Sequence, residues 1–314
     1  MKIICDIDNI GNMHWFVASN GIFLQYSSNY VMLRWVFPQV IAIWITLLFF
    51  IENKEKIQYY LTLMMPSMLF GTLSFIGIIP IAIGYALYEL VCERKFAIWF
   101  RKVFSIENMI TLFTLGSILI LYFYGNILSE KPKSVSFQSM PYENHKEIYF
   151  VFVIIMVLLY SLCIWIDNKR NALFYLAVLS LLGLPLFKMG MWNDLVMRCS
   201  IPSLFILMYL ILKFLNKYMC LNIFKDTNTS VIIKVLPILA CVILLIGSYY
   251  PLLELKSSME TKVCCAKVEE TNFGSMEQFA NRNLHNIPDD VKYNYYSYNI
   301  ENNLFYKIVS RNKI

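Results

Sequence analysis

The sequence predicts an all-α membrane protein with about eight transmembrane or re-entrant helices and a small polar C-terminal extracytoplasmic segment. The chain of 314 residues is 58% hydrophobic and 15% charged, whereas soluble domains are about half apolar and about a quarter charged. The apolar residues gather in blocks, and the block 148–166 contains no charged side chain. As a helix this block would reach roughly 28 Å, about the thickness of a bilayer core. Several such blocks therefore indicate membrane insertion.

Eight apolar segments define the expected helices. The second and third form one stretch that is too long for a single span and is interrupted by Pro66, Gly71, Gly77 and Pro80. We expect two short helices in a hairpin, with a tip near 72–74 that lies at the interface or dips into the membrane and is covered by protein. The segments are 35–51, 57–73, 74–91, 110–128, 148–166, 172–188, 201–216 and 232–250.

The distribution of Lys and Arg predicts the orientation in the cell membrane. If residues 1–34 are an extracytoplasmic loop, the inner loops and helix ends carry 12 Lys and Arg and the two outer loops carry 5, as the positive-inside rule favours. The transmembrane domain is then 35–250, and 251–314 is an extracytoplasmic polar tail. Because the net charge of +6 lies mostly in short loops, we expect membrane lipids rather than nucleic acid as partners. The eight cysteines show no metal-ligand spacing, so we expect no metal site and no disulfide framework.

The N-terminus lacks a basic segment followed by an apolar core, so it is not a signal peptide. The charge count nevertheless places it outside the cytoplasm. A chain that starts outside without a signal suggests that earlier spans are missing. Our hypothesis from the sequence is that this is the C-terminal part of a longer protein.

The first candidate site is an acidic cluster before the first apolar segment. Asp6, Asp8 and His14 combine two carboxylates with an imidazole, which suits general base catalysis or metal binding. The alternative is a solvated loop, because an Asp-x-Asp pattern is short. If the cluster is catalytic on the outer side of the membrane, a lipid-linked sugar is a better donor than a sugar nucleotide, because sugar nucleotides reside in the cytoplasm.

The second candidate lies where a polar, aromatic run enters the first apolar helix. Arg34 can meet a lipid phosphate, and Trp35 fits the headgroup zone. Pro38 suits the first turn of a helix, and Gln39 then lies near the membrane boundary. Anchoring at the interface is the alternative interpretation.

The third candidate precedes the seventh apolar segment. Asp194 and Arg198 are four residues apart and are expected to pair on one helix face, and Asn193 or Asp194 can cap that helix. An Arg beside an outer-leaflet cavity is a suitable ligand for phosphate or pyrophosphate. The alternative is a cap with a local salt bridge.

These stretches, together with LSFIGIIP at 73–80 and WNDLVMRCSIPSL at 192–204, resemble a group of bacterial multi-pass proteins similar to GT-C membrane glycosyltransferases. The resemblance covers roughly 6–204, and weakly 302–311. It implies sugar transfer from a polyprenyl-phosphate carrier on the outer face, with Asp8 or Asp6 as the acidic residue that acts as catalytic base and Arg198 as a phosphate contact. It also implies that helices and a large outer loop precede residue 6 in full-length relatives, and the usual catalytic acid lies in that loop.

Three functional hypotheses follow, and the sequence leaves catalytic activity itself open. The first is a glycosyltransferase, truncated or whole, acting on a lipid-linked sugar in envelope polysaccharide assembly without a cofactor. His14, Arg34, Gln39, Asn193, Asp194 and Arg198 would bind the substrate. The second is a transporter or flippase for a lipid-linked or small polar substrate. The broken hairpin 57–91 favours this hypothesis, whereas the scarcity of ionisable residues in the span centres is evidence against it. The third is a non-catalytic membrane subunit.

Overall fold

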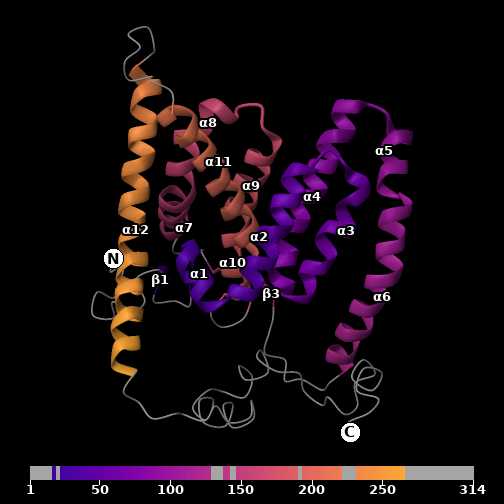
Figure 1. The fold of residues 1–314 in the computed structure, drawn as a ribbon, viewed down its shortest axis with the longest axis horizontal. Helices are drawn as coiled ribbons and strands as arrows, with labels where there is room; N and C mark the ends of the chain where they lie inside the picture. The colour runs from indigo at the N-terminus through magenta and orange to yellow at the C-terminus, as the bar shows by residue number, and fades with distance from the viewer. Residues whose placement is uncertain are drawn as a thin grey trace. The chain divides into compact units, whose positions relative to one another are not determined.

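The computed structural model describes residues 16–18, 22–128, 137–141, 146–189, 193–220 and 231–265, which are predominantly helical (Figure 1). The helices are α1 Asn29–Trp35, α2 Phe37–Glu52, η2 Ile57–Tyr59, α3 Tyr60–Met64, η3 Met65–Leu69, α4 Thr72–Glu93, α5 Phe96–Val103, α6 Ile106–Leu128, α7 Lys146–Val153, η4 Ile154–Leu158, α8 Leu159–Asn168, α9 Ala172–Gly183, η5 Leu184–Leu186, α10 Asp194–Cys199, α11 Ile201–Cys220 and α12 Val231–Cys265. The strands are β1 Phe16–Ala18, β2 Ile22–Leu24, β3 Phe137–Ser139 and β4 Phe187–Met189.

Each of the eight predicted apolar segments contains helix, but they differ in length. Five helical runs are long and apolar enough to cross a membrane: Thr72–Glu93, Phe96–Tyr124, Lys146–Asn168, Asp194–Tyr218 and Ile233–Leu253. Two further apolar helices, Phe37–Glu52 and Ala172–Leu186, are shorter. The described residues therefore define a helical, multi-pass membrane protein with five candidate spans, where the sequence predicted about eight transmembrane or re-entrant helices.

The stretch 57–91 folds as a broken hairpin, but its second arm is the long helix α4, a candidate span of 22 residues, so the expectation of two short helices was wrong. Its first arm is a succession of short pieces, η2, α3 and η3, in which Pro66 occupies the start of η3. The break comes at Gly71, next to the predicted tip. Gly77 and Pro80, however, lie inside the continuous helix α4, so the expectation that they interrupt the stretch was wrong. Helices within membranes tolerate Gly and Pro because neighbouring groups satisfy the freed backbone.

Two small antiparallel strand pairs depart from the expected all-α fold. Strand β1 pairs with β2, so that Phe16 lies opposite Leu24, and β3 pairs with β4, so that Phe137 lies opposite Met189. The second pair ties the segment after α6 to the end of α9, and Met140 N donates to Leu186 O at 2.9 Å just beyond it. Strands of three residues are too short to show a period-two pattern in the sequence.

The chain divides into two compact units, 1–109 with 137–254 and 110–136 with 255–314. Of the second, the structure describes most of α6 and the end of α12. The first contains the core, in which α9 packs against α4 and α11, α10 against α4, and α2 against α11. Its largest fully buried side chains include Leu47 and Phe50 of α2, Ile81 of α4, Ile164 of α8 and Leu181 of α9.

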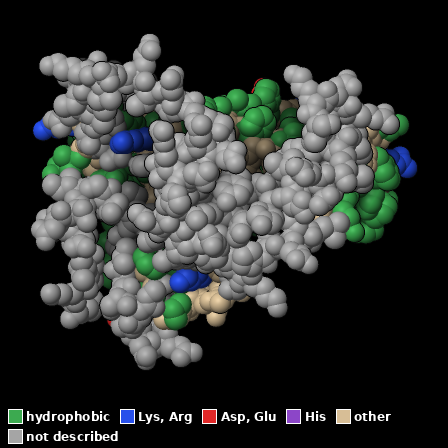
Figure 2. All heavy atoms as spheres, turned by 90° about the horizontal axis from the view of Figure 1, so that it is seen from below, with side chains coloured by type: hydrophobic (Ala, Val, Ile, Leu, Met, Phe, Trp, Pro, Cys, Tyr) green, Lys and Arg blue, Asp and Glu red, His purple; other side chains and the backbone are tan. Residues whose placement is uncertain are grey.

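Apolar side chains also cover much of the outer surface. On α12, Leu245 and Ile246 are each 71% exposed, and Ile83 of α4 is exposed as well. In the view from below, the coloured side chains are mostly hydrophobic, with few Lys or Arg among them (Figure 2). Such a surface is costly in water and is expected where helices face lipid.

The helices of the larger unit run between two chemically different ends. The strand end carries β1–β4, α1 and α10 (Figure 1). The opposite end, which we call the basic end, carries the turns 53–56, 94–95 and 169–171, the end of α11 and the start of α12. Lys and Arg of the basic end are Lys54, Lys56, Arg94, Lys95, Arg101, Lys102, Lys169, Arg170, Lys213, Lys217 and Lys234, and those of the strand end are Arg34, Lys146, Lys188 and Arg198.

Candidate functional site at the strand end

Asn193 joins three pieces of the strand end. Its amide nitrogen donates to Phe23 O at 3.0 Å and to Phe187 O at 3.4 Å, and its amide oxygen accepts from Met189 N at 3.2 Å. The residue is 2% exposed and has a φ of 52°, a left-handed conformation that Asn tolerates better than most residues. It occupies the N-cap of α10 as predicted, but its side chain makes no capping bond. Its amide instead holds β2, β4 and α10 together, and substrate binding by Asn193 stays a prediction.

The predicted ion pair between Asp194 and Arg198 is confirmed. Arg198 Nε lies 3.3 Å from Asp194 Oδ1, one helical turn apart on α10, and the side chains are 26% and 33% exposed respectively. The Nε atom is shielded from solvent and its contact with Asp194 does not meet hydrogen-bond geometry. A guanidinium has five N–H donors. Arg198 is therefore a partly exposed cation that is held in place from one side by a carboxylate.

Helix α10 is fixed to α4 by a close backbone contact. A Cβ added at Gly77 would lie 2.1 Å from the backbone oxygen of Cys199, and the Cys199 thiol donates to Leu73 O at 3.0 Å. Glycine is needed at residue 77 because backbone cannot move aside as a flexible side chain can. The contact positions Arg198, the neighbour of Cys199, beside the first turns of α4.

The other predicted residues of this end lie on α1 and α2. Ser28 caps α1 by accepting from Val31 N at 3.3 Å, and Arg34 is exposed in the last turn of that helix. Gln39 is half-buried in the first turn of α2, against the break at Gly71, where an added Cβ would lie 2.8 Å from Gln39 Cγ. The Gln39 Oε1 atom is buried without a hydrogen-bond partner among the described residues.

The third group of predicted site residues is the acidic cluster near the N-terminus. Asp6, Asp8 and His14 lie outside the described residues, so their predicted catalytic and binding roles stay predictions. Among the residues that the structure describes, no group of three or more His, Cys, Asp or Glu side chains could hold a metal ion.

Sequence reasoning missed small polar side chains buried inside the apolar helices. Ser74 of α4 and Ser203 of α11 are fully buried, and neither hydroxyl has a hydrogen-bond partner in the described part of the chain. Both lie near α10, since Leu73 contacts Cys199 and Ser200 precedes α11. A buried hydroxyl without a partner is costly. The sequence signal for these buried hydroxyls was one serine near the start of each of the two mainly apolar helices.

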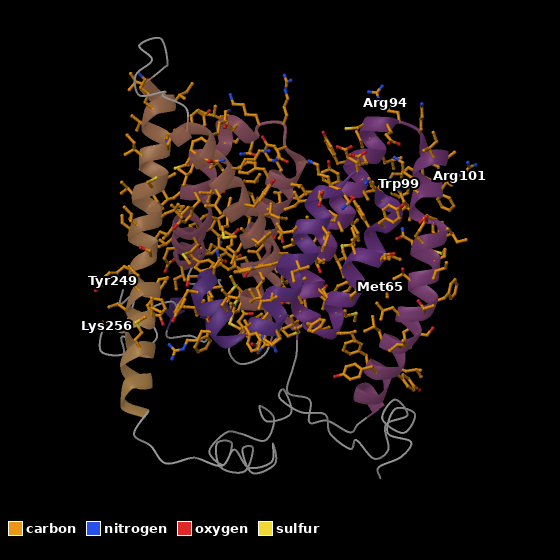
Figure 3. The ribbon with its side chains drawn as sticks, viewed as in Figure 1. Met65, Arg94, Trp99, Arg101, Tyr249 and Lys256 are labelled. Atoms are coloured by element: carbon orange, nitrogen blue, oxygen red, sulfur yellow. The ribbon has the colours of Figure 1, made fainter. Side chains whose placement is uncertain are left out.

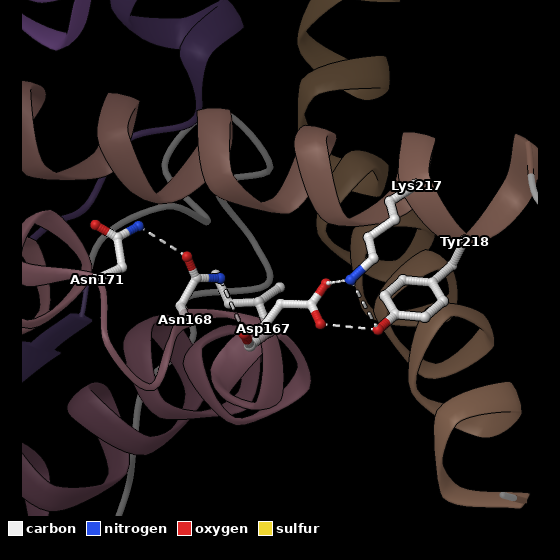
Figure 4. Close-up of polar contacts among 6 residues, drawn as sticks. Asp167, Asn168, Asn171, Lys217 and Tyr218 are labelled. Atoms are coloured by element: carbon white, nitrogen blue, oxygen red, sulfur yellow. Dashed lines mark hydrogen bonds and ion pairs between the residues drawn. The ribbon is translucent and has the colours of Figure 1, made fainter.

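A second missed cluster lies at the basic end, where α8 meets α11 (Figure 4). Asp167 accepts from Lys217 Nζ at 3.0 Å and from Tyr218 OH at 2.8 Å. Beside it, Asn171 donates to Asn168 Oδ1 at 2.9 Å, and Asn168 donates to Ile164 O at 3.0 Å. These bonds fasten helix ends together, and Lys217, which is half exposed, is the one charged group of the cluster that reaches well into solvent.

The fold and the five candidate spans define a helical multi-pass membrane protein. Comparison of the chain with models of known protein families, with curated proteins and with solved structures finds no match. The resemblance to GT-C enzymes therefore rests on the sequence blocks alone.

Proposed function

We propose that this membrane protein binds the phosphate or diphosphate of a polyprenyl-linked sugar at its strand end and transfers the sugar as a GT-C-like glycosyltransferase of the bacterial cell membrane. The observation that supports the proposal is Arg198, held by Asp194 on a helix that is fixed to α4. A guanidinium supplies the planar, multiple donors that a phosphate accepts. Arg34 lies at the same end on an exposed turn, and Asp8 or Asp6 would supply the catalytic base.

The partial exposure of the ion pair supports a ligand role for Arg198. The side chains of Arg198 and Asp194 are 26% and 33% exposed, so the guanidinium keeps access to solvent beside the carboxylate. Asp194 leaves several guanidinium donors for an anion, while it restrains the side chain that presents them. Arg198 thus combines a preorganised position with unused donor capacity.

The proposal is tested with the purified 314-residue chain in nanodiscs, titrated with polyprenyl phosphate or with the uncharged polyprenol. The wild type should bind the phosphate form selectively. Arg198→Ala should weaken that binding about 10- to 100-fold, because a hydrogen bond to a charged group contributes about 1.5–3 kcal/mol. Arg198→Lys should retain part of the affinity through its charge.

The matched control is Asp194→Asn, which removes the salt bridge and keeps the guanidinium. A ligand role for Arg198 predicts that this variant loses much less affinity for polyprenyl phosphate than Arg198→Ala, because the guanidinium remains. Equal losses in Arg198→Ala and Asp194→Asn, accompanied by equal falls in melting temperature, would leave Arg198 as half of a structural ion pair and remove the support for the proposal.

A transporter or flippase is the second candidate, because the arm 57–69 is a succession of short helices that stops at Gly71 beside the unpaired Gln39 Oε1. Broken helices of this kind form binding sites in transporters. Flux of a labelled polyprenyl phosphate across proteoliposomes supports this class. Sugar transfer that is lost in Asp8→Asn supports the glycosyltransferase.

A further inference from the structure

Helix α5 presents a row of exposed aromatic side chains at the basic end. Phe96, Phe100 and Phe104 follow one another at every fourth position, with ring centroids 6.0 Å and 4.5 Å apart. All three side chains are exposed, and Ile98 is exposed as well. Large apolar side chains in such a row need an apolar partner outside the described residues.

The helix is attached firmly to the end of α4 by its opposite face. Trp99 Nε1 donates to Ala86 O at 2.7 Å, and Lys102 Nζ lies 2.6 Å from Glu93 Oε1. Lys102 is neutralised by this contact. The aromatic row is therefore displayed on a fixed support and is not a loosely tethered segment.

Three cations flank the aromatic row without an anionic partner. Arg94, Lys95 and Arg101 are exposed, and none of them forms an ion pair among the described residues. Figure 3 shows Arg94 and Arg101 pointing away from the helices, whereas Trp99 points between α4 and α5. Arg101 lies on the same outward face of α5 as Phe100 and Phe104, since the three fall within about 100° at 3.6 residues per turn.

The backbone at Arg94 gives an independent indication of function. Arg94 ends α4 with a φ of 51°, in the left-handed region, and its N–H donates to Leu90 O at 3.0 Å. Glycine is the usual residue at such a helix end, because a side chain there is strained. A strained residue that persists is a sign that its side chain is needed.

The charge pattern of the neighbouring span indicates that α5 lies at the membrane interface. The candidate span Phe96–Tyr124 has 29 residues and is interrupted between α5 and α6, whereas a single crossing needs about 20 residues. Its charged turns carry Arg101 and Lys102, next to Arg94 and Lys95. Charged and aromatic side chains of this kind are expected where the headgroups meet the acyl chains.

We propose that Arg94, Lys95 and Arg101 bind the phosphate of an anionic phospholipid whose acyl chains lie along Phe96, Phe100 and Phe104. We call these six residues the α5 collar. The cations supply charge complementarity to the headgroup, and the aromatic row supplies the apolar surface for the chains. The predicted orientation puts the collar in the cytoplasmic leaflet, where anionic lipids concentrate. This site is separate from the proposed sugar-lipid site at the strand end.

The test is native mass spectrometry of the purified, delipidated 314-residue chain, titrated with phosphatidylglycerol or phosphatidylcholine. The wild type should bind phosphatidylglycerol more tightly. Since each Lys or Arg near an anionic lipid surface contributes about fivefold, Arg94→Gly should weaken the binding of phosphatidylglycerol about fivefold, and the triple variant R94G/K95Q/R101Q up to about 100-fold.

Two controls make the outcome decisive. Arg94→Gly should leave the melting temperature unchanged or raised, because glycine relieves the left-handed strain, so a loss of lipid binding cannot be attributed to unfolding. The pair K169Q/R170Q removes charge from the same end and should keep the lipid preference. The proposal is overturned if the triple variant retains the preference, if K169Q/R170Q lowers it equally, or if millimolar inorganic phosphate displaces the lipid.

Discussion

At the scale of single residues, two polar residues of the segment 193–198 play different roles at the strand end. Asn193 and Arg198 lie five positions apart and were both expected to bind substrate. In the structure, the Asn193 amide makes hydrogen bonds with three backbone groups, one of β2 and two of β4. Arg198 is partly exposed, and within the described part of the chain it forms one ion pair. Sequence alone could not separate these roles, because the partners of Asn193 include a residue 170 positions away.

Substitution of Asn193 measures this structural role. Asn193→Ala leaves buried backbone groups without partners and forces alanine into the left-handed region, so it should destabilise the protein by about 2–4 kcal/mol. Asn193→Gly keeps the backbone conformation and should cost less than Asn193→Ala. Thermal unfolding in detergent, followed by tryptophan fluorescence, measures the difference. Equal melting temperatures for the wild type and both variants would refute the structural role of Asn193 in holding β2, β4 and α10 together.

At the scale of elements, the apolar segments predicted the helices well and their internal breaks less well. The break at Gly71 was expected, but α4 continues through Gly77 and Pro80. Gly77 is explained by the approach of Cys199 across 122 positions of sequence, a contact that no local pattern encodes. The small strands and the pairing of Asp167 with Lys217 also depend on segments distant in the chain.

Two glycines of α4, compared with one of α9, test how closely α4 is packed. Gly77→Ala meets backbone at 2.1 Å and should destabilise by about 1–3 kcal/mol. Gly84→Ala meets the flexible end of Leu176 at 2.3 Å and should cost less. Gly183→Ala meets nothing within 4 Å at the end of α9 and should be neutral or stabilising by about 0.4–1 kcal/mol. The order of melting temperatures in detergent checks the packing, and an equal response at all three positions would contradict it.

At the scale of the whole molecule, composition determined the class of protein and the charge pattern suggested its orientation. The described residues gather most Lys and Arg of the larger unit at the basic end (Figure 1), which the positive-inside rule assigns to the cytoplasm. The strand end, with Asp194, Arg198 and Arg34, is then predicted to face outward. The acidic candidates Asp6 and Asp8, together with His14, lie outside the described residues, so three of the eight predicted site residues rest on the sequence.

The central claim, that the strand end faces outward and the basic end inward, is tested most directly by cysteine accessibility. Single cysteines are introduced at Ser139 of the strand end and at Lys169 of the basic end, both exposed, in a chain whose eight native cysteines are replaced. A membrane-impermeant maleimide should label S139C in intact cells and K169C only after the membrane is permeabilised. Labelling of K169C but not S139C in intact cells would show that the protein has the opposite orientation. The proposed sugar-lipid site would then not lie on the outer face.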